Sequence, residues 1–164
     1  MTDDLNLPAG AQLHPDFPGW YHWTDIPPDS FGAQTGLMLF RAEGPREARA
    51  ARVRMFPTAL HLNNGGSIHG GAVMSFIDMA LFAGGRCAGM GEGHYVTLDC
   101  ATRFIARGRI GIPLDAHVRL LKQTPGGLVF IHGHCEQDGA ICYSFTGTLK
   151  KIKLRSDTGD EPRR

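Results

Sequence analysis

Residues 71–82 have the sequence GAVMSFIDMALF, which is apolar on every face of a helix apart from Ser75 and Asp78. A helix that is apolar all round has to be covered by protein on most of its sides. The stretch therefore predicts one central helix, at about 71–82, with the rest of the domain wrapped around it.

Extended segments precede and follow this helix. Six strands are predicted, at 34–42 and 47–56 before the helix and at 94–105, 114–124, 128–137 and 140–152 after it. Turn residues mark three of the connections, at Gly44-Pro45, Pro125-Gly126-Gly127 and Asp138-Gly139. An antiparallel sheet curled around the helix buries the most apolar surface, so the predicted class is α+β. The crossover through the helix can join strands that are not neighbours.

The two ends of the chain differ from this domain. Residues 1–33 hold five prolines and the aromatic residues Trp20, Tyr21 and Trp23, without a sustained period. They predict an irregular arm whose aromatic residues cover the sheet or cap a pocket, and we favour the first alternative. Residues 155–164 are charged and lack apolar anchors, which predicts a flexible tail. The folded domain is expected at 34–154.

The composition excludes several classes of partner. Lys and Arg number 17 against 16 Asp and Glu, so the chain lacks the net positive charge that would attract nucleic acid. The N-terminal segment does not resemble a secretory signal, and no stretch has the roughly 20 apolar residues of a membrane span. The four cysteines lack C-x-x-C spacing, which favours reduced thiols. A cytoplasmic protein without a nucleic-acid or membrane partner is expected.

Asp78 is the only charged residue of the central helix. An ionised carboxylate in apolar surroundings is costly unless it is paired or hydrogen-bonded. A catalytic aspartate that transfers protons would explain it. A structural aspartate, bonded to a neighbouring loop or to Ser75 or placed at a subunit seam, would explain it equally well.

The segment before the helix, LNNGGSIHGG at 62–71, contains a candidate oxyanion site. Gly70 and Gly71 let a substrate approach the backbone closely. The first N–H groups of a helix have no intrahelical partner and lie at the positive end of its dipole. The alternative is that the two glycines only allow a tight joint between loop and helix. Asn63 and His69 are either site residues or loop residues with satisfied hydrogen bonds.

The spacing of Asn63, His69-Gly70-Gly71 and Asp78, followed by YVTLD at 95–99, resembles the hot-dog-fold acyl-CoA thioesterases of the phenylacetate-pathway (PaaI-like) type. The resemblance covers roughly 34–152. It implies a long helix wrapped by a curled sheet, and two subunits that pair their sheets edge to edge as a homodimer, often stacked as a homotetramer. It also implies an active site at the dimer seam and hydrolysis of an acyl-CoA to a carboxylic acid and free coenzyme A.

The same resemblance implies a role for each site residue. The Gly70 amide would polarise the thioester carbonyl, and Asp78, from the partner subunit, would act as general base or nucleophile. Asn63 and Thr97 would hold the thioester or the attacking water, and His69 would shape the loop.

Substrate contacts are expected from two groups of residues. Gly71, Met74 and Phe82 are expected to line the substrate pocket. The densest basic cluster near the proposed cleft is expected to bind the phosphates of coenzyme A, since arginine suits phosphate, and it consists of Arg103, Arg107 and Arg109. Solvated loop charges are the alternative.

No metal or redox cofactor is expected. Coenzyme A would enter only as part of the substrate. His132-x-His134 places two imidazoles on one strand face, but no third ligand follows at a diagnostic spacing, which favours an ordinary exposed strand. Two rival functions stay open: a non-catalytic acyl-CoA sensor, and a dehydratase on the same fold that would use His69 with Asp78.

Overall fold

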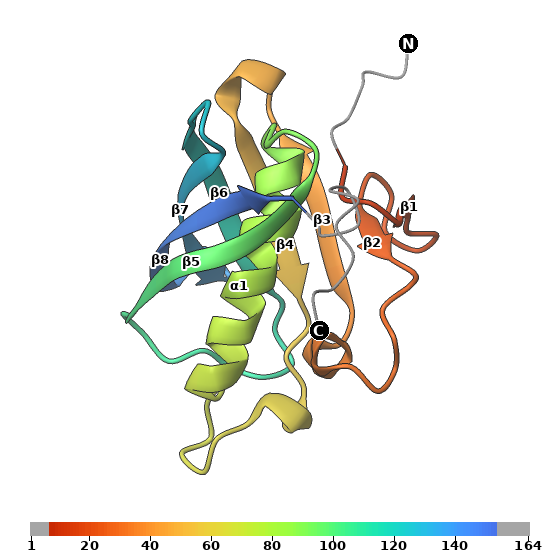
Figure 1. The fold of residues 1–164 in the computed structure, drawn as a ribbon. Coiled ribbons are helices and arrows are strands. Elements are labelled where there is room, and N and C mark those ends of the chain that lie inside the picture. Colours follow the sequence, from red (N-terminus) through yellow and green to blue (C-terminus); the bar gives the residue numbers. More distant parts are fainter. Residues whose placement is uncertain (1–6, 154–164) are drawn as a thin grey trace, which may run out of the picture.

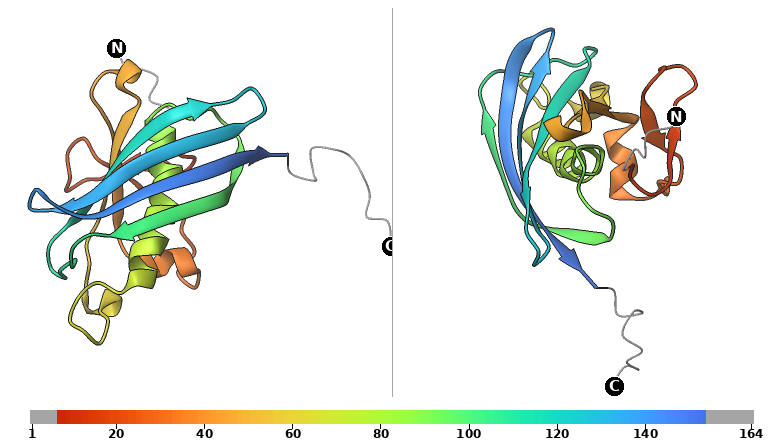
Figure 2. Two further views of the ribbon diagram at one scale, coloured as in Figure 1. Left: turned by 90° about the vertical axis from the view of Figure 1, so that its left-hand side faces the viewer. Right: turned by 90° about the horizontal axis from the view of Figure 1, so that it is seen from above.

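An antiparallel sheet curls around one long helix, α1 (Gly70–Cys87), in the computed structural model, which describes residues 7–153 (Figures 1 and 2). The sheet has eight strands: β1 (Ala11–Leu13), β2 (Tyr21–Trp23), β3 (Met38–Glu43), β4 (Ala50–Met55), β5 (His94–Phe104), β6 (Leu114–Gln123), β7 (Leu128–Gln137) and β8 (Ala140–Ile152). Short 3-10 helices lie in three connections: η1 (Phe31–Thr35), η2 (Arg46–Ala48) and η3 (Ala59–His61). The predicted class and the central helix are confirmed.

The strands follow the order β1-β2-β3-β4-β6-β7-β8-β5, and every neighbouring pair is antiparallel. The crossover through α1 joins β4 to β5, which are not neighbours, as predicted. β5 forms one margin of the sheet and β1 the other. No helix within 7–153 is long and apolar enough to cross a membrane. The predicted tail at 155–164 lies outside the described residues.

The central helix is longer than predicted, because it continues through Gly84 and Gly85 to Cys87. Glycine weakens a helix, so the pair is typical of a helix end. Here both glycines face the sheet: a Cβ on Gly84 would lie 2.6 Å from Val118, and one on Gly85 would lie 2.9 Å from Ile131. The glycines thus let α1 approach β6 and β7 closely, and tertiary packing overrides the local preference.

The N-terminal arm is more regular than predicted. Its β1 and β2 extend the sheet beyond β3, but strands of three residues are too short to show a period. The Trp20 ring lies under the guanidinium groups of Arg41 and Arg54, at 4.4 and 4.9 Å, and the Trp23 ring lies 4.8 Å from that of Phe40. Trp20 and Trp23 thus contact β3 and β4, as the favoured alternative predicts, while Trp23 also lines a cavity with Phe82.

Two predicted strands begin later than expected. Residues 34–35 end η1, so the strand predicted at 34–42 starts at Met38. Residues 46–48 form η2, so the strand predicted at 47–56 starts at Ala50. The strands predicted after the helix match β5 to β8 within one residue at each end.

We expect Gly84→Ala to destabilise the fold, although alanine is the better helix former. The gain in helix propensity is about 1 kcal/mol. The added Cβ would lie within 2.9 Å of three side-chain atoms of Val118, which is 1% exposed, and overpacking of this kind costs about 1–3 kcal/mol. The free energy of unfolding, measured by urea titration, should therefore fall.

The control is the same substitution in a Val118→Ala background, where two of the three crowding atoms are gone. There Gly84→Ala should cost less than in the wild-type chain. A Gly84→Ala protein that is more stable than wild type would contradict the close approach of α1 to β6.

Candidate active site

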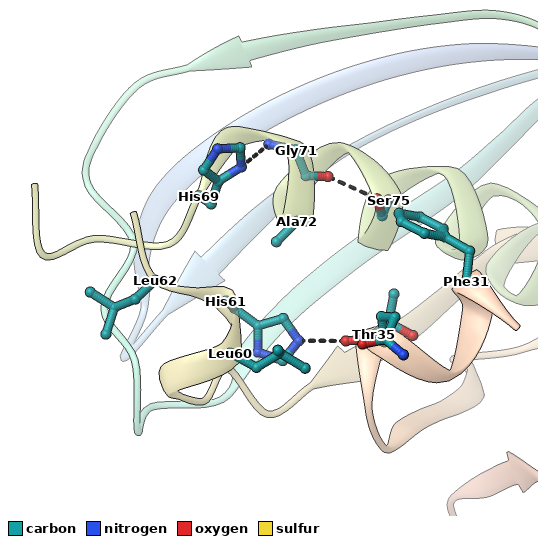
Figure 3. Close-up of a pocket in the computed structure, with 10 residues that line it drawn as sticks. Phe31, Thr35, Leu60, His61, Leu62, His69, Gly71, Ala72 and Ser75 are labelled. Carbon is teal, nitrogen blue, oxygen red and sulfur yellow. Dashed lines mark hydrogen bonds between the residues drawn. The ribbon is translucent and has the colours of Figure 1, made fainter. Parts of the chain in front are cut away.

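The first turn of α1 is capped by His69, the residue that precedes it. Nδ1 of the His69 ring accepts a hydrogen bond from the N–H of Gly71 at 2.9 Å (Figure 3). Within residues 7–153, the amides of Gly70 and Ala72 have no hydrogen-bond partner. The positive end of α1 therefore presents two free N–H groups, and Gly70 supplies the first of them.

A cavity of about 450 Å³ lies beside this helix start (Figure 3). Its walls come from η1, η3 and the first two turns of α1, and include Phe31, Leu60, Leu62, His69, Ala72 and Ser75. The buried His61 joins two of these walls, because its Nδ1 accepts from Thr58 N–H at 2.9 Å and its Nε2 lies 2.9 Å from the carbonyl oxygen of Gln34. With Nδ1 accepting, Nε2 carries the proton and donates it.

Asp78 lies in a second cavity, of about 480 Å³, further along α1. Phe31 and Ser75 line both cavities, so the two lie on the same flank of the helix. From β5, Oγ1 of Thr97 donates a hydrogen bond to Oδ1 of Asp78 at 2.7 Å. Ser75 is not the partner of Asp78, since its hydroxyl donates to the carbonyl of Gly71 at 2.8 Å. The hydrogen-bond partner of the Asp78 carboxylate is therefore the Thr97 hydroxyl of β5.

Cys100 shares this cavity with Asp78. Burial raises the pKa of the Cys100 thiol, and the negative charge of Asp78 raises it further. A thiol held in its protonated form is a weak nucleophile. Of the two groups, the Asp78 carboxylate is the better candidate for chemistry.

Gly70 and Asp78 of one chain cannot act on the same thioester. They stand eight residues apart on one helix, and a rise of about 1.5 Å per residue separates them by about 12 Å along the axis. A carbonyl and its attacking water lie within about 3 Å of the groups that bind them. A complete site would therefore take Gly70 from one copy and Asp78 from another, which is the arrangement that the family resemblance implies.

Asn63 is engaged within its own loop. Its Oδ1 accepts from the N–H groups of Gly65 and Ser67 at 2.9 and 3.1 Å, and its Nδ2 donates to Oγ of Ser67 at 3.0 Å. These contacts are those of the loop-stabilising alternative.

The three predicted phosphate-binding arginines have different partners. Arg107 donates to the carbonyl oxygen of Gly65, in the loop before α1. Arg109 pairs with Asp138 at 2.9 Å, in the turn between β7 and β8. Arg103 lies on β5 opposite Ser144. Only Arg107 lies against the loop that leads to the helix start.

The predicted pocket residues line three different cavities. Gly71 lines the cavity at the helix start, and Met74 lines that of Asp78. Phe82 instead lines a cavity at the far end of α1, with Trp23 and Met90 among its walls. The sequence interpretation missed Phe31 and Cys100. Phe31 belongs to the arm, where no period marks it, and Cys100 follows a β-bulge between Thr97 and Asp99 that changes the alternation of β5.

A second cluster of titratable groups lies on the central strands of the sheet. His134 and Glu136 of β7 gather with His117 of β6, whereas His132 is not part of this group. Glu136 is only two residues from His134, and His117 comes from the neighbouring strand by pairing, which sequence spacing does not show. Burial lowers the pKa of His134, and the adjacent His117 lowers it further.

A curled antiparallel sheet around one helix, with the helix carboxylate bonded to a strand hydroxyl, defines a protein of the hot-dog class. Residues 65–137 match the family model of the thioesterase superfamily. The PaaI-like resemblance predicted from the sequence is confirmed at this level.

Several solved structures are similar to this chain. The Escherichia coli PaaI protein of the phenylacetic acid degradation operon is 25% identical, with a TM-score of 0.57 over 64% of this chain and 74% of its own. A phenylacetic acid degradation-related protein of Ralstonia eutropha is 21% identical, with a TM-score of 0.61 over 77% and 93%. PaaI of Thermus thermophilus, as a mutant, is 21% identical, with a TM-score of 0.59 over 70% and 93%. No curated protein sequence gives a significant match.

Proposed function

We propose that this protein is a cytoplasmic acyl-CoA thioesterase, which hydrolyses the thioester to a carboxylic acid and free coenzyme A. The observation that carries the proposal is the 2.7 Å hydrogen bond from Thr97 to Asp78 inside a cavity lined mainly by apolar residues. A carboxylate that is held by one oxygen and open at the other is suited to accept a proton from water. The match of residues 65–137 to the thioesterase superfamily model supports the same reaction class.

In the proposed mechanism, Oδ1 of Asp78 is fixed by Thr97 and Oδ2 takes a proton from water. The water oxygen attacks the thioester carbonyl carbon, and the oxyanion that forms accepts the N–H of Gly70 from the second subunit. The tetrahedral intermediate then expels the coenzyme A thiolate, which receives the proton that Asp78 took from water, so that the carboxylate is restored. Direct attack by Asp78 would instead form an acyl-enzyme anhydride, which hydroxylamine would trap.

The proposal includes a pair of subunits joined along β5. Among residues 7–153, this strand of eleven residues pairs only with β8, so its other edge is open in the described sheet. Large apolar side chains are exposed along it, including Val96, Leu98 and Phe104. Pairing of two β5 strands would satisfy the open backbone groups and cover these side chains. We assign the phosphates of coenzyme A to Arg107, the arginine that contacts the loop before α1.

The test is release of free thiol from a panel of aryl and medium-chain acyl-CoAs, followed with a chromogenic thiol reagent. We expect turnover of at least one member, at about 1 s⁻¹ or faster. Burial raises the pKa of the Cys87 thiol to about 12, so this thiol should react slowly with the reagent. A blank without substrate measures the reaction of all the protein's own thiols.

The rival functions give other results in this assay. Tight binding of acyl-CoA without thiol release across the panel would favour the sensor. Conversion of a 3-hydroxyacyl-CoA to an enoyl-CoA would favour the dehydratase. In one chain, His69 and Asp78 stand nine residues apart on the helix, about 13 Å along its axis, and Nδ1 of His69 is already occupied. These contacts do not favour an acid and base pair.

A further inference from the structure

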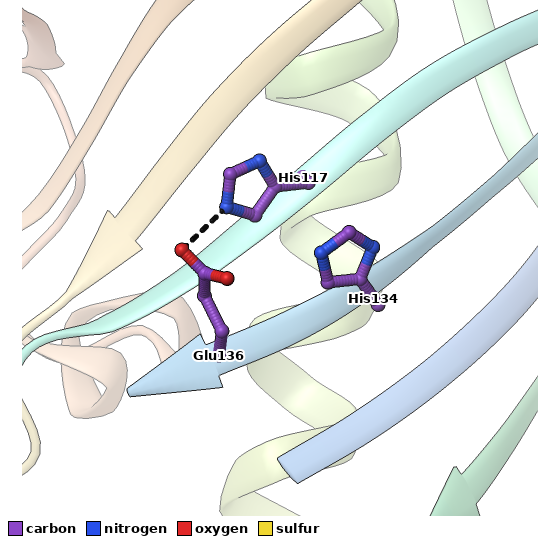
Figure 4. A group of neighbouring side chains, drawn as sticks. All are labelled: His117, His134 and Glu136. Carbon is purple, nitrogen blue, oxygen red and sulfur yellow. Dashed lines mark ion pairs between the residues drawn. The ribbon is translucent and has the colours of Figure 1, made fainter. Parts of the chain in front are cut away.

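Three side chains with metal-binding atoms meet on the face of the sheet turned away from α1 (Figure 4). His117 of β6 stands directly opposite His134 of β7 in the strand pairing, and Glu136 follows two residues later on the same face. One ligand atom from each side chain lies within 4.8 Å of the other two. The opposite face of β6 belongs to the core, since Ala116 and Val118 are buried there.

The imidazole nitrogens of this cluster lack hydrogen bonds to the described part of the protein. The His117 and His134 rings are stacked, with centroids 4.7 Å apart and planes at 9°. Among residues 7–153, neither ring makes a hydrogen bond. Nε2 of His117 is buried and lies 2.9 Å from Oε1 of Glu136, yet the contact lacks the alignment of a hydrogen bond. A nitrogen and an oxygen placed side by side in this way can both face one ion.

The nearby arginines Arg52 and Arg54 bind carboxylates other than Glu136. Arg54 makes two bonds to Asp115, at 2.6 and 2.7 Å, and Arg52 pairs with Glu43 at 3.1 Å. Both arginines therefore have other carboxylates as partners, and Arg52 shares Glu43 with Arg41. Glu136 forms its ion pair with His117. Two imidazoles and one negative charge remain together on a rigid pair of central strands.

We propose that His117, His134 and Glu136 form a binding site for one divalent transition-metal ion, best matched by Zn²⁺, with water in the fourth position. Imidazole nitrogens and one carboxylate oxygen suit zinc, cobalt and nickel, whereas magnesium and calcium prefer oxygen ligands throughout. Bond lengths of about 2.0–2.1 Å place bound ligand atoms about 3.3 Å apart, so side-chain rotation draws the trio together around the ion.

The site is separate from the proposed thioesterase centre, because it lies across the sheet from α1 and Asp78. A metal there ties β6 to β7 and stabilises the sheet. The proposal does not rest on the proposed activity, and its test needs no substrate.

The test uses tag-free protein that has been stripped with a chelator and exchanged into metal-free buffer. Calorimetry with Zn²⁺ is expected to show one equivalent per chain, with a Kd on the order of micromolar. Saturating Zn²⁺ should raise Tm by about 5 °C. Co²⁺ should give the visible absorption of a four-coordinate ion, a signal that non-specific surface binding does not produce.

Variants show whether these three residues hold the ion. His117→Asn, His134→Asn and Glu136→Gln should each weaken Zn²⁺ binding by about tenfold or more. His132→Asn is the matched control, because it alters an imidazole on the same strand and the same face but outside the trio, and it should leave the Kd unchanged. Melting in chelator checks that each variant is folded. Absence of stoichiometric binding, or equal loss in His132→Asn, would overturn the proposal.

Discussion

Replacing Gly70 by proline is expected to lower kcat by about 10²–10³-fold, the effect of losing one oxyanion donor. Proline removes the N–H that the helix start presents and puts carbon in its place. The fold should tolerate this change, because Gly70 is the first residue of α1, the position at which proline is most readily accepted in a helix. His69 already has the extended conformation that a residue before proline adopts, with φ −61° and ψ 135°.

Gly70→Ala is the matched control, since it adds a side chain but keeps the N–H. Its Cβ would lie 3.5 and 3.6 Å from two ring atoms of Phe104, which is ordinary van der Waals contact. We expect this variant to retain kcat within about tenfold of wild type. Steady-state kinetics on the best acyl-CoA of the panel makes the comparison. Equal losses in the two variants would indicate a steric effect and would remove the Gly70 amide from the mechanism.

Asp78→Asn is expected to lower kcat by at least about a hundredfold, the low end of what general acid–base catalysis contributes. Asparagine has the same shape and can still accept the hydrogen bond of Thr97, but it cannot take a proton from water. The loss should therefore appear in kcat far more than in KM. Glu47→Gln, an exposed change on η2, controls for the loss of one negative charge. Full activity in Asp78→Asn would refute the assignment.

Mixed subunits test where the two halves of the site come from. If Gly70 of one copy works with Asp78 of another, a dimer of one Gly70→Pro chain and one Asp78→Asn chain has one intact site and one doubly altered site. An equal mixture that has been dissociated and reassociated at random should then regain about a quarter of wild-type activity. No recovery in verified mixed dimers would place both groups in one chain's site.

The sequence predicted the features that local patterns encode. The helix core at 71–82 is apolar on all sides, and the turns at Gly126-Gly127 and Asp138-Gly139 separate strands whose ends are nearly right. The end of α1 was predicted too early because Gly84 and Gly85 have a poor helix propensity, and only their contact with the sheet explains them. β1 and β2 were missed because three residues show no period.

The candidate site was predicted in part. Family resemblance brought Asp78 and Thr97 to one place, and their hydrogen bond joins residues nineteen positions apart. The engagement of Asn63 with Ser67 depends on the loop conformation, which a spacing pattern does not contain. His117 and His134 meet through strand register, a long-range property, and so the trio with Glu136 could not be recognised from the spacing of His132 and His134 alone.

The two margins of the sheet differ in a way that limits how far copies of this chain can polymerise. β5 offers eleven residues at one margin, whereas β1, at the other margin of the described sheet, offers three. A sheet with two long open margins can add copies without end, as fibres do. If two copies pair along β5 as proposed, the margins that then face outward are the three-residue β1 strands. Strands this short offer too few backbone groups to add a further copy, so the N-terminal arm would limit the assembly to two chains.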